Sequence, residues 1–298
     1  MSVLPDFLLV GASKSGTSSI YHYLRQHPEI FLSDVQKEGR YFSQMEGNFS
    51  GPGDTRVDAT ITRNPEQYKA LFQNCKNEKA VGDISPEYLY FHEKAIPLIK
   101  KVLGADTKII IILRSPVERA FSGYLHFKRD KRETLSFEQA LEKEEERKQK
   151  NWIWAWQYKN SGLYYEQVKA YLDNFTNVKV IVFDDLREQP QKVLAEICAF
   201  IGVNPGFDFD TSYKYNVSGT PKNQALYKLE TSRKFVIFLK KLMPKKLAQK
   251  LKNRLTGEKQ MEKEEMLPET RKQLIEFFRD DILKLEKLIQ KDLSHWLK

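Results

Sequence analysis

Residues 7–24, FLLVGASKSGTSSIYHYL, carry the clearest information on the fold. It begins with a short apolar run, Phe7 to Val10, which is typical of a buried strand. Gly11 and Gly16 bound the turn that follows, and apolar residues at helical spacing continue from Thr17. A strand, a glycine-containing turn and a helix leave unpaired backbone N–H groups at the helix N-terminus, where anions bind. The alternative interpretation is a plain turn without a ligand.

This turn departs from the loop of nucleoside triphosphatases, which has the pattern G-x-x-x-x-G-K-[ST]. Gly11 and Gly16 have the required spacing, but Thr17 occupies the lysine position and Lys14 lies inside the loop. The turn therefore predicts an anion site with an unusual lysine. The stretch predicted to form this site is Gly11-Ala12-Ser13-Lys14-Ser15-Gly16-Thr17-Ser18-Ser19.

The rest of the chain alternates strands and helices as far as about residue 202. KIIIIL (108–113) and VKVIVF (178–183) are apolar enough for strands buried in a parallel sheet, and 80–82 is a weaker strand candidate. Helices are predicted from Pro116 and over three further segments. The expected fold class is α/β: a P-loop-type parallel sheet flanked by helices, in one domain spanning 1–298. The further predicted helical segments are 136–150, with a solvated charged face, 191–201, and a C-terminal extension at 227–298 without strands.

Composition excludes several classes of protein. The 298 residues are 41% hydrophobic, which is too much for a disordered chain, and two cysteines cannot build a disulfide scaffold or a four-cysteine zinc site. No residues have metal-ligand spacing, so no metal site is expected. The net charge of +9 is compatible with an anionic ligand, although no nucleic-acid-binding motif is present. Without a signal peptide or an apolar run near 18 residues, the sequence predicts a cytoplasmic protein with no transmembrane segment.

A second anion site is predicted after the strand at 108–113. Arg114 follows this strand directly, where a magnesium-dependent triphosphatase usually has an aspartate that holds the metal. Ser122, in the following helix, could add a hydroxyl to the same anion. The alternative is a simple ion pair between Arg114 and Glu118. Two phosphate sites without a metal-binding aspartate describe an adenosine bisphosphate better than ATP.

Together these segments resemble the sulfotransferases that use 3′-phosphoadenosine 5′-phosphosulfate (PAPS), in the bacterial and heparan-sulfate-like branch. The resemblance runs along nearly the whole chain, and the most specific match is IILRSPVERAFS at 111–122. The other matching segments are 7–19, KEGRYF at 37–42, VFDDL at 182–186, VSGTPK at 217–222, and the C-terminal segment 267–296.

The resemblance implies sulfuryl transfer from PAPS to an acceptor hydroxyl by direct in-line displacement, leaving the bisphosphate PAP. It implies that Lys14 to Ser19 bind the 5′-phosphosulfate and that Arg114 and Ser122 bind the 3′-phosphate. Glu38 is the implied general base, with a pKa that we expect partial burial to raise, and Lys14 is the implied catalytic cation at the leaving group. The alternative for Glu38 is a surface carboxylate paired with Lys37 or Arg40. The residues implied to close over the nucleotide are Ser218, Gly219 and Lys222.

The sequence departs from the family at two positions. Cytosolic sulfotransferases use a histidine near the segment 80–86, and none is present here. The heparan-sulfate branch has a lysine where this chain has Ile84, so a second catalytic cation is missing. If Glu38 is not the base, Asp83 and His126 are the other candidates. His126 also matches a position that contacts acceptors in the cytosolic branch, the alternative being a packed or solvated histidine.

Two other functions stay open: a P-loop kinase using ATP, and a nucleotide-binding module without catalysis. The predicted partner is a hydroxyl-bearing acceptor, which is a carbohydrate, a lipid or a small molecule. The aromatic cluster Trp152, Trp154 and Trp156 either lines an acceptor site or fills the core. The basic amphipathic segment 233–254 contacts an anionic membrane peripherally, guides an acidic acceptor, or packs on the sheet as a helix with a lysine-rich exterior.

Overall fold

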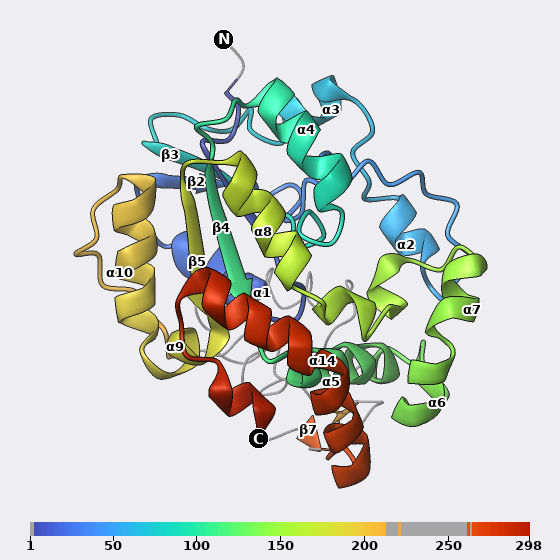
Figure 1. Cartoon of the computed structure of the whole chain (residues 1–298). Coiled ribbons are helices and arrows are strands. Elements are labelled where there is room, and N and C mark those ends of the chain that lie inside the picture. Colours follow the sequence, from blue (N-terminus) through green and yellow to red (C-terminus); the bar gives the residue numbers. More distant parts are fainter. Residues whose placement is uncertain (1–2, 213–219, 222–260, 263) are drawn as a thin grey trace.

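The computed structural model describes residues 3–212, 220–221, 261–262 and 264–298. Its centre is a five-stranded parallel sheet flanked by helices (Figure 1), which confirms the predicted α/β class. In spatial order the strands are β2 (Ile30–Leu32), β3 (Ala80–Ile84), β1 (Phe7–Gly11), β4 (Lys108–Leu113) and β5 (Val178–Val182).

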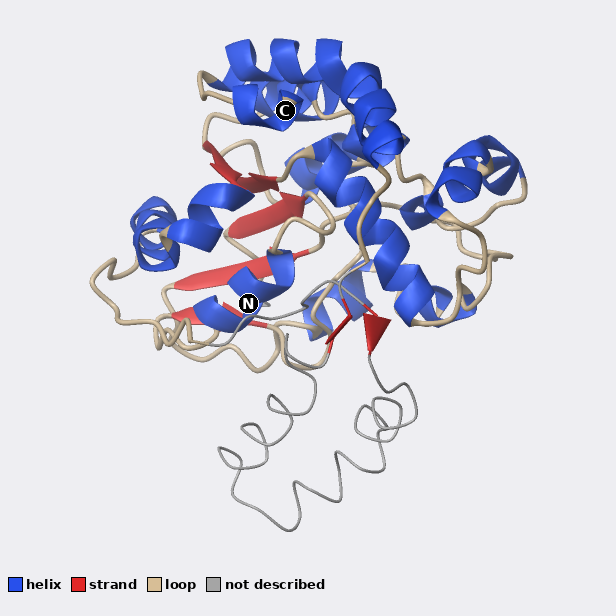
Figure 2. Ribbon diagram, turned by 90° about the horizontal axis from the view of Figure 1, so that it is seen from below, coloured by secondary structure: helices blue, strands red, loops and turns tan. Residues whose placement is uncertain are grey.

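Alternation along the central strands divides the core into two layers. Leu8, Ile109 and Ile111 face one layer, and Leu9 and Ile110 face the other. Both layers are buried, because helices cover the two faces of the sheet (Figure 2) and crossover connections place helices on both sides of parallel strands. The continuous apolar runs in the sequence are the consequence of this double burial.

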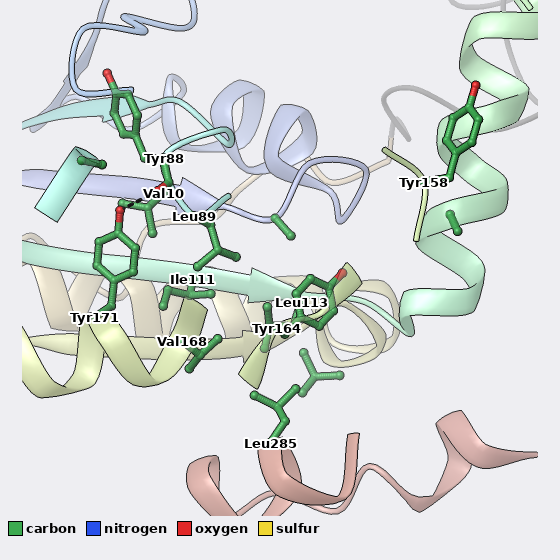
Figure 3. Close-up of a cluster of buried hydrophobic side chains, with 14 of the residues drawn as sticks. Val10, Tyr88, Leu89, Ile111, Leu113, Tyr158, Tyr164, Val168, Tyr171 and Leu285 are labelled. Carbon is green, nitrogen blue, oxygen red and sulfur yellow. Dashed lines mark hydrogen bonds between the residues drawn. The ribbon is translucent and has the colours of Figure 1, made fainter. Parts of the chain in front are cut away.

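The long helices are divided between these layers. Figure 3 shows Val168 and Tyr171 of one helix packed beside Ile111 of β4, with Leu285 of another helix below them. The helices that bury residues in this layer are α4 (His92–Val102), α5 (Pro116–Arg129), α8 (Tyr165–Asn174) and α14 (Pro268–Ile289). The opposite layer contains α1 (Thr17–Leu24), α9 (Phe183–Glu188) and α10 (Pro190–Ile201).

Shorter elements complete the described chain. Two two-residue strands form a separate antiparallel pair, so the prediction that the C-terminal extension contains no strand is wrong at this point. These strands are β6 (Thr220–Pro221) and β7 (Met261–Glu262), and the short helices are α2 (Thr55–Asp58), α3 (Pro65–Ala70), α6 (Phe137–Glu142), α7 (Glu144–Gln149), η1 (Trp154–Trp156), η2 (Asn160–Gly162) and η4 (Ser294–Leu297). No helix within the described ranges combines the length and the apolar character needed to cross a bilayer.

Two predictions of local structure were wrong. The segment 136–150 forms two short helices that meet at Lys143, and its charged run is only partly solvated. Glu144 and Arg147 are buried, and Arg147 makes a bidentate ion pair with Glu133 at 2.8 and 3.0 Å. The strand β5 was predicted to be buried, but its first three residues are half-buried because β5 is an edge strand.

The carboxyl ends of the strands meet at one edge of the sheet, where α/β proteins bind ligands. β1 leads there into the turn 11–16, β2 into the segment containing Glu38, and β4 into Arg114. The strand β3 lies between β2 and β1, so the residues that follow it separate the Glu38 segment from the glycine turn.

Candidate active site

The glycine turn has no room for side chains at its two glycines. A Cβ atom on Gly11 would lie 2.4 Å from Cβ of Leu89, and Gly16 adopts a φ of 94°, which L side chains rarely reach. Gly16 is also the N-cap of α1, so the first N–H groups of this helix point out of the helix end without intrahelical partners. The hydroxyl Oγ of Ser15 is buried beside the Tyr164 hydroxyl, and neither group has a hydrogen-bond partner of good geometry in the described structure. An orphaned donor beside free N–H groups fits an anion such as phosphate.

Lys14 provides the cation of this turn. Its side chain is half-buried, and within the described residues its ammonium makes no ion pair. Burial, followed by the charges of Arg129 and Arg114, lowers its pKa from 10.5 to about 7. The site around Lys14 therefore has an excess of positive charge that an anionic ligand would neutralise.

Arg114 lies beside this turn, so the two predicted anion sites are adjacent. Its Nη1 donates to the carbonyl oxygen of Lys14 at 3.4 Å, and its guanidinium lies over the Phe183 ring at 5.2 Å. The alternative ion pair with Glu118 also exists, at 3.6 Å, but Glu118 is shared with Arg271. Burial lowers the pKa of Arg114, as expected for a guanidinium without a full complement of counter-charge.

The other predicted turn residues surround the same point. Thr17, Ser18 and Ser19 form the first turn of α1, with Thr17 buried and the two serines half-buried. Ser122 lies in α5, the helix that begins two residues after Arg114, and it is buried. Ser218, Gly219 and Lys222, like the segment 233–254, lie outside the described residues.

Glu38 follows β2 and is enclosed by two cations. Its carboxylate pairs with Arg40 and, at 3.4 Å, with Nζ of Lys37, while 21% of its side chain stays exposed. Burial raises the pKa of Glu38, but the charges of Arg40 and Lys37 outweigh burial and hold the pKa below its ordinary value. The expected upward shift of the Glu38 pKa is therefore wrong, because the ion pairs with Lys37 and Arg40, which the sequence offered as the alternative, are both present. The carboxylate is ionised and able to accept a proton.

Asp83, at the end of β3, fixes the segment that contains Glu38. Its Oδ1 accepts hydrogen bonds from Gly39 N at 3.2 Å and from Ser85 Oγ at 2.7 Å. Its Oδ2 accepts from the hydroxyls of Tyr68 at 3.0 Å and Tyr88 at 2.8 Å. A carboxylate that is 3% exposed and accepts four hydrogen bonds has a structural position, and its geometry does not favour the role of an alternative base.

Lys37 connects the Glu38 segment to the glycine turn. Its Nζ donates to Oγ of Ser18 at 2.7 Å and to Oε1 of Glu38 at 3.4 Å. The sequence identified the Lys37–Glu38 pair but gave Lys37 no role, since the contact with Ser18 joins segments that follow different strands.

His126 belongs to the positively charged surroundings of Lys14. The charge of Lys14, followed by burial and the charge of Arg129, lowers the pKa of His126 to about 2, so the imidazole is neutral. Its Nδ1 accepts a hydrogen bond from Nη2 of Arg129 at 2.6 Å. A ring nitrogen occupied in this way is unavailable as a general base. The predicted contact between His126 and an acceptor stays a prediction.

The tryptophan cluster serves mainly as packing. Trp156 is fully buried, stacks on Phe127 with ring centroids 4.0 Å apart, and donates to the Asp54 carboxylate at 3.1 Å. Trp152 and Trp154 are half-buried and pack against the same core. Tyr164, which follows this cluster in the sequence, is fully buried and places its ring at the arrowhead end of β4 (Figure 3).

The described residues contain no group of three or more His, Cys, Asp or Glu side chains that could hold a metal ion. The charged groups at this edge of the sheet are dominated by cations, with Glu38 as the partly exposed carboxylate beside them. The site can therefore bind an anionic ligand through its cations, and Glu38 can accept a proton next to that ligand.

The model of the sulfotransferase domain family matches residues 4–288. The chain belongs to this family. A sulfotransferase from Alicyclobacillus acidocaldarius, known from a crystal structure, is 36% identical to the chain with a TM-score of 0.79, and the match covers 99% of this chain and 100% of the other. Mouse sulfotransferase SULT7A1 complexed with PAP is 17% identical with a TM-score of 0.50 over 93% of this chain and 84% of that protein, which shows the shared fold.

Curated relatives are longer proteins. The membrane-associated sulfotransferase kil1 of Dictyostelium discoideum is 34% identical over 148 residues, which are 47% of this chain and 28% of that protein. The human bifunctional heparan sulfate N-deacetylase/N-sulfotransferase 3 is 24% identical over 222 residues, or 72% of this chain and 24% of that protein. The chain thus spans about a quarter of the length of these relatives. The predicted family is confirmed, and it supports sulfuryl transfer over the alternative of an ATP-dependent kinase.

Proposed function

We propose that the chain transfers a sulfuryl group from PAPS to an acceptor hydroxyl by direct in-line displacement and releases PAP. The observation that carries the proposal is the contact between Arg114 and the carbonyl oxygen of Lys14. It joins two cationic sites that follow different strands, and a nucleotide with phosphates on both the 3′ and the 5′ position of its ribose needs two such sites. PAPS, when bound, supplies an activated sulfuryl group and a phosphate as leaving group.

The residues of the glycine turn fit the 5′ end of this ligand. The unpartnered hydroxyl of Ser15 and the free N–H groups of the first turn of α1 are donors for phosphate oxygens. The Lys14 ammonium would neutralise the charge that develops on the leaving oxygen, which stabilises the transition state more than the ground state. Arg114 and Ser122 would hold the 3′-phosphate, with Ser218, Gly219 and Lys222 proposed to close over the nucleotide. Since Lys14 and Arg114 supply the positive charge, the proposed reaction needs no metal.

Glu38 is the proposed general base. Its carboxylate is ionised and partly exposed, and it would accept the proton of the acceptor hydroxyl while the acceptor oxygen bonds to sulfur. The electron pair of the broken sulfur–oxygen bond remains on the leaving phosphate. The proposed acceptors carry hydroxyls: carbohydrates, lipids or small molecules. A single domain over residues 1–298 and a cytoplasmic location stay predictions.

The variant Glu38→Gln tests the proposal against a nucleotide-binding module without catalysis. Removal of a general base typically costs about 10²–10⁴-fold in rate, so we expect kcat with labelled PAPS and a panel of hydroxyl acceptors to fall by that factor while PAP affinity persists. Glu276→Gln, an exposed change on α14, is the matched control. Unchanged turnover in Glu38→Gln would remove Glu38 from the mechanism, and no turnover by the wild-type chain with any acceptor would favour the binding module.

A further inference from the structure

Lys37 joins the two halves of the site. The proposed leaving-group site follows β1 and the proposed base follows β2, and β3 lies between these strands in the sheet. The Lys37 ammonium crosses this gap, with its Nζ 2.7 Å from Oγ of Ser18 on one side and 3.4 Å from Oε1 of Glu38 on the other. In an in-line transfer the sulfuryl group moves between a leaving oxygen at the turn and an acceptor oxygen at the base. The Lys37 ammonium therefore lies along the path of the group that is transferred.

The ammonium group of Lys37 has one N–H donor left for a ligand. A lysine ammonium carries three N–H donors, and Ser18 and Glu38 take two of them. Among the described residues no third hydrogen-bond acceptor is paired with Nζ of Lys37, although its charge also lies 5.9 Å from the centroid of the Tyr21 ring. The side chain is 26% exposed, so a ligand can reach it. The third donor and the positive charge together match one of the non-bridging oxygens of a sulfuryl group.

We propose that Lys37 is a further catalytic residue, which donates a hydrogen bond to the transferring sulfuryl group and holds Glu38 against it. This role rests on the proposed sulfuryl transfer. Lys37 only donates hydrogen bonds in this role, and the acceptor proton goes to Glu38. Ile84, at the end of β3, is buried and apolar, so this strand end supplies no positive charge to the site. In the described part of the site, Lys37 supplies positive charge next to Glu38.

The test compares PAPS with PAP in the absence of acceptor, because the two ligands differ by the sulfuryl group alone. A hydrogen bond to a charged group contributes about 1.5–3 kcal/mol, which converts to about a tenfold to hundredfold change in Kd. For Lys37→Met we expect calorimetry to show PAPS affinity reduced by at least about tenfold, with PAP affinity reduced less than about threefold. We also expect kcat to fall by about 10²–10³-fold.

Two further variants separate this role from a general effect of charge or folding. Lys179→Met removes a lysine of nearly equal exposure, 24%, that pairs with Glu196 at 3.1 Å on the edge strand, and we expect it to leave both affinities unchanged. Lys37→Arg keeps the charge and should retain part of the preference for PAPS, which also shows that position 37 tolerates substitution without unfolding.

Equal losses of PAPS and PAP affinity in Lys37→Met, or no loss of either, would overturn the role of Lys37 while leaving the proposed function intact. If the wild-type chain binds neither ligand, the proposed function itself is wrong.

Discussion

The lowered pKa of Lys14 predicts that binding of PAP depends strongly on pH. The pKa of about 7 in the free protein arises from burial and from the charges of Arg129 and Arg114. A bound phosphate favours the ammonium form, so the pKa of Lys14 rises on binding and the protein takes up a proton. The uptake is about half a proton at pH 7 and about 0.9 of a proton at pH 8, because those are the fractions of neutral lysine at these pH values.

The same equilibrium sets the affinity. Above pH 7 only the protonated fraction of Lys14 binds the anion well, and this fraction falls tenfold per pH unit. PAP affinity should therefore fall by about tenfold from pH 8 to pH 9. The folding stability of the protein without ligand depends on pH in the opposite direction. Between pH 7 and 10.5, a lysine in the unfolded chain, with a pKa of 10.5, binds more protons than Lys14 does in the folded chain. The contribution of Lys14 to folding stability therefore increases with pH over this window.

Isothermal titration calorimetry in two buffers of different ionisation enthalpy measures both quantities at pH 7, 8 and 9. Lys14→Arg is the control, since a guanidinium stays protonated over this range and should give little proton uptake and a nearly flat affinity. A wild-type affinity that is constant from pH 7 to 9, with no proton uptake, would refute the reasoning.

Two other substitutions test the surroundings of Glu38. Asp83→Asn replaces the carboxylate that accepts four hydrogen bonds, so we expect thermal unfolding to show about 1–3 kcal/mol of lost stability. We also expect kcat to fall more than PAP affinity. Equal losses of kcat and PAP affinity would mean that Asp83 does not act on the Glu38 segment. Arg40→Gln removes a cation that lowers the pKa of Glu38, and activity is lost as this base becomes protonated, so the acid limb of kcat/KM should move to higher pH. An acid limb at the wild-type pH would show that Arg40 does not set the pKa of the base.

Much of the fold could be predicted because its strands are continuous apolar runs. Residues 7–10 and 108–113 are buried on both faces of the sheet, and such burial leaves a clear pattern. The strand Ile30–Leu32 was missed because three residues carry too little periodicity to be recognised. The charged segment 136–150 was misjudged because the burial of Arg147 depends on Glu133, a partner outside the segment.

The sequence predicted which residues would make up the candidate site, but it did not predict the contacts between them. The glycine spacing and the position of Arg114 after a strand predicted two candidate anion sites, and the structure places their residues side by side because strand ends converge in a parallel sheet. The pKa direction of Glu38 was wrong because it depends on Arg40, whose backbone adopts a φ of 57°. The contacts of Lys37 with Ser18 and of Asp83 with Gly39 join segments that are far apart in the sequence. A pattern of neighbouring residues therefore cannot predict them.

We propose above that two adjacent cationic sites hold an adenosine with phosphates on the 3′ and 5′ positions of its ribose, and calorimetry without magnesium measures whether both phosphates contribute to binding. PAP should bind at least about tenfold more tightly than ADP, which lacks the 3′-phosphate, because hydrogen bonds to charged groups contribute this much or more. Arg114→Ala should abolish most of this preference, whereas Arg279→Ala, an exposed change on α14, should keep it. Equal binding of PAP and ADP by the wild-type chain, or a preference that survives in Arg114→Ala, would contradict the claim.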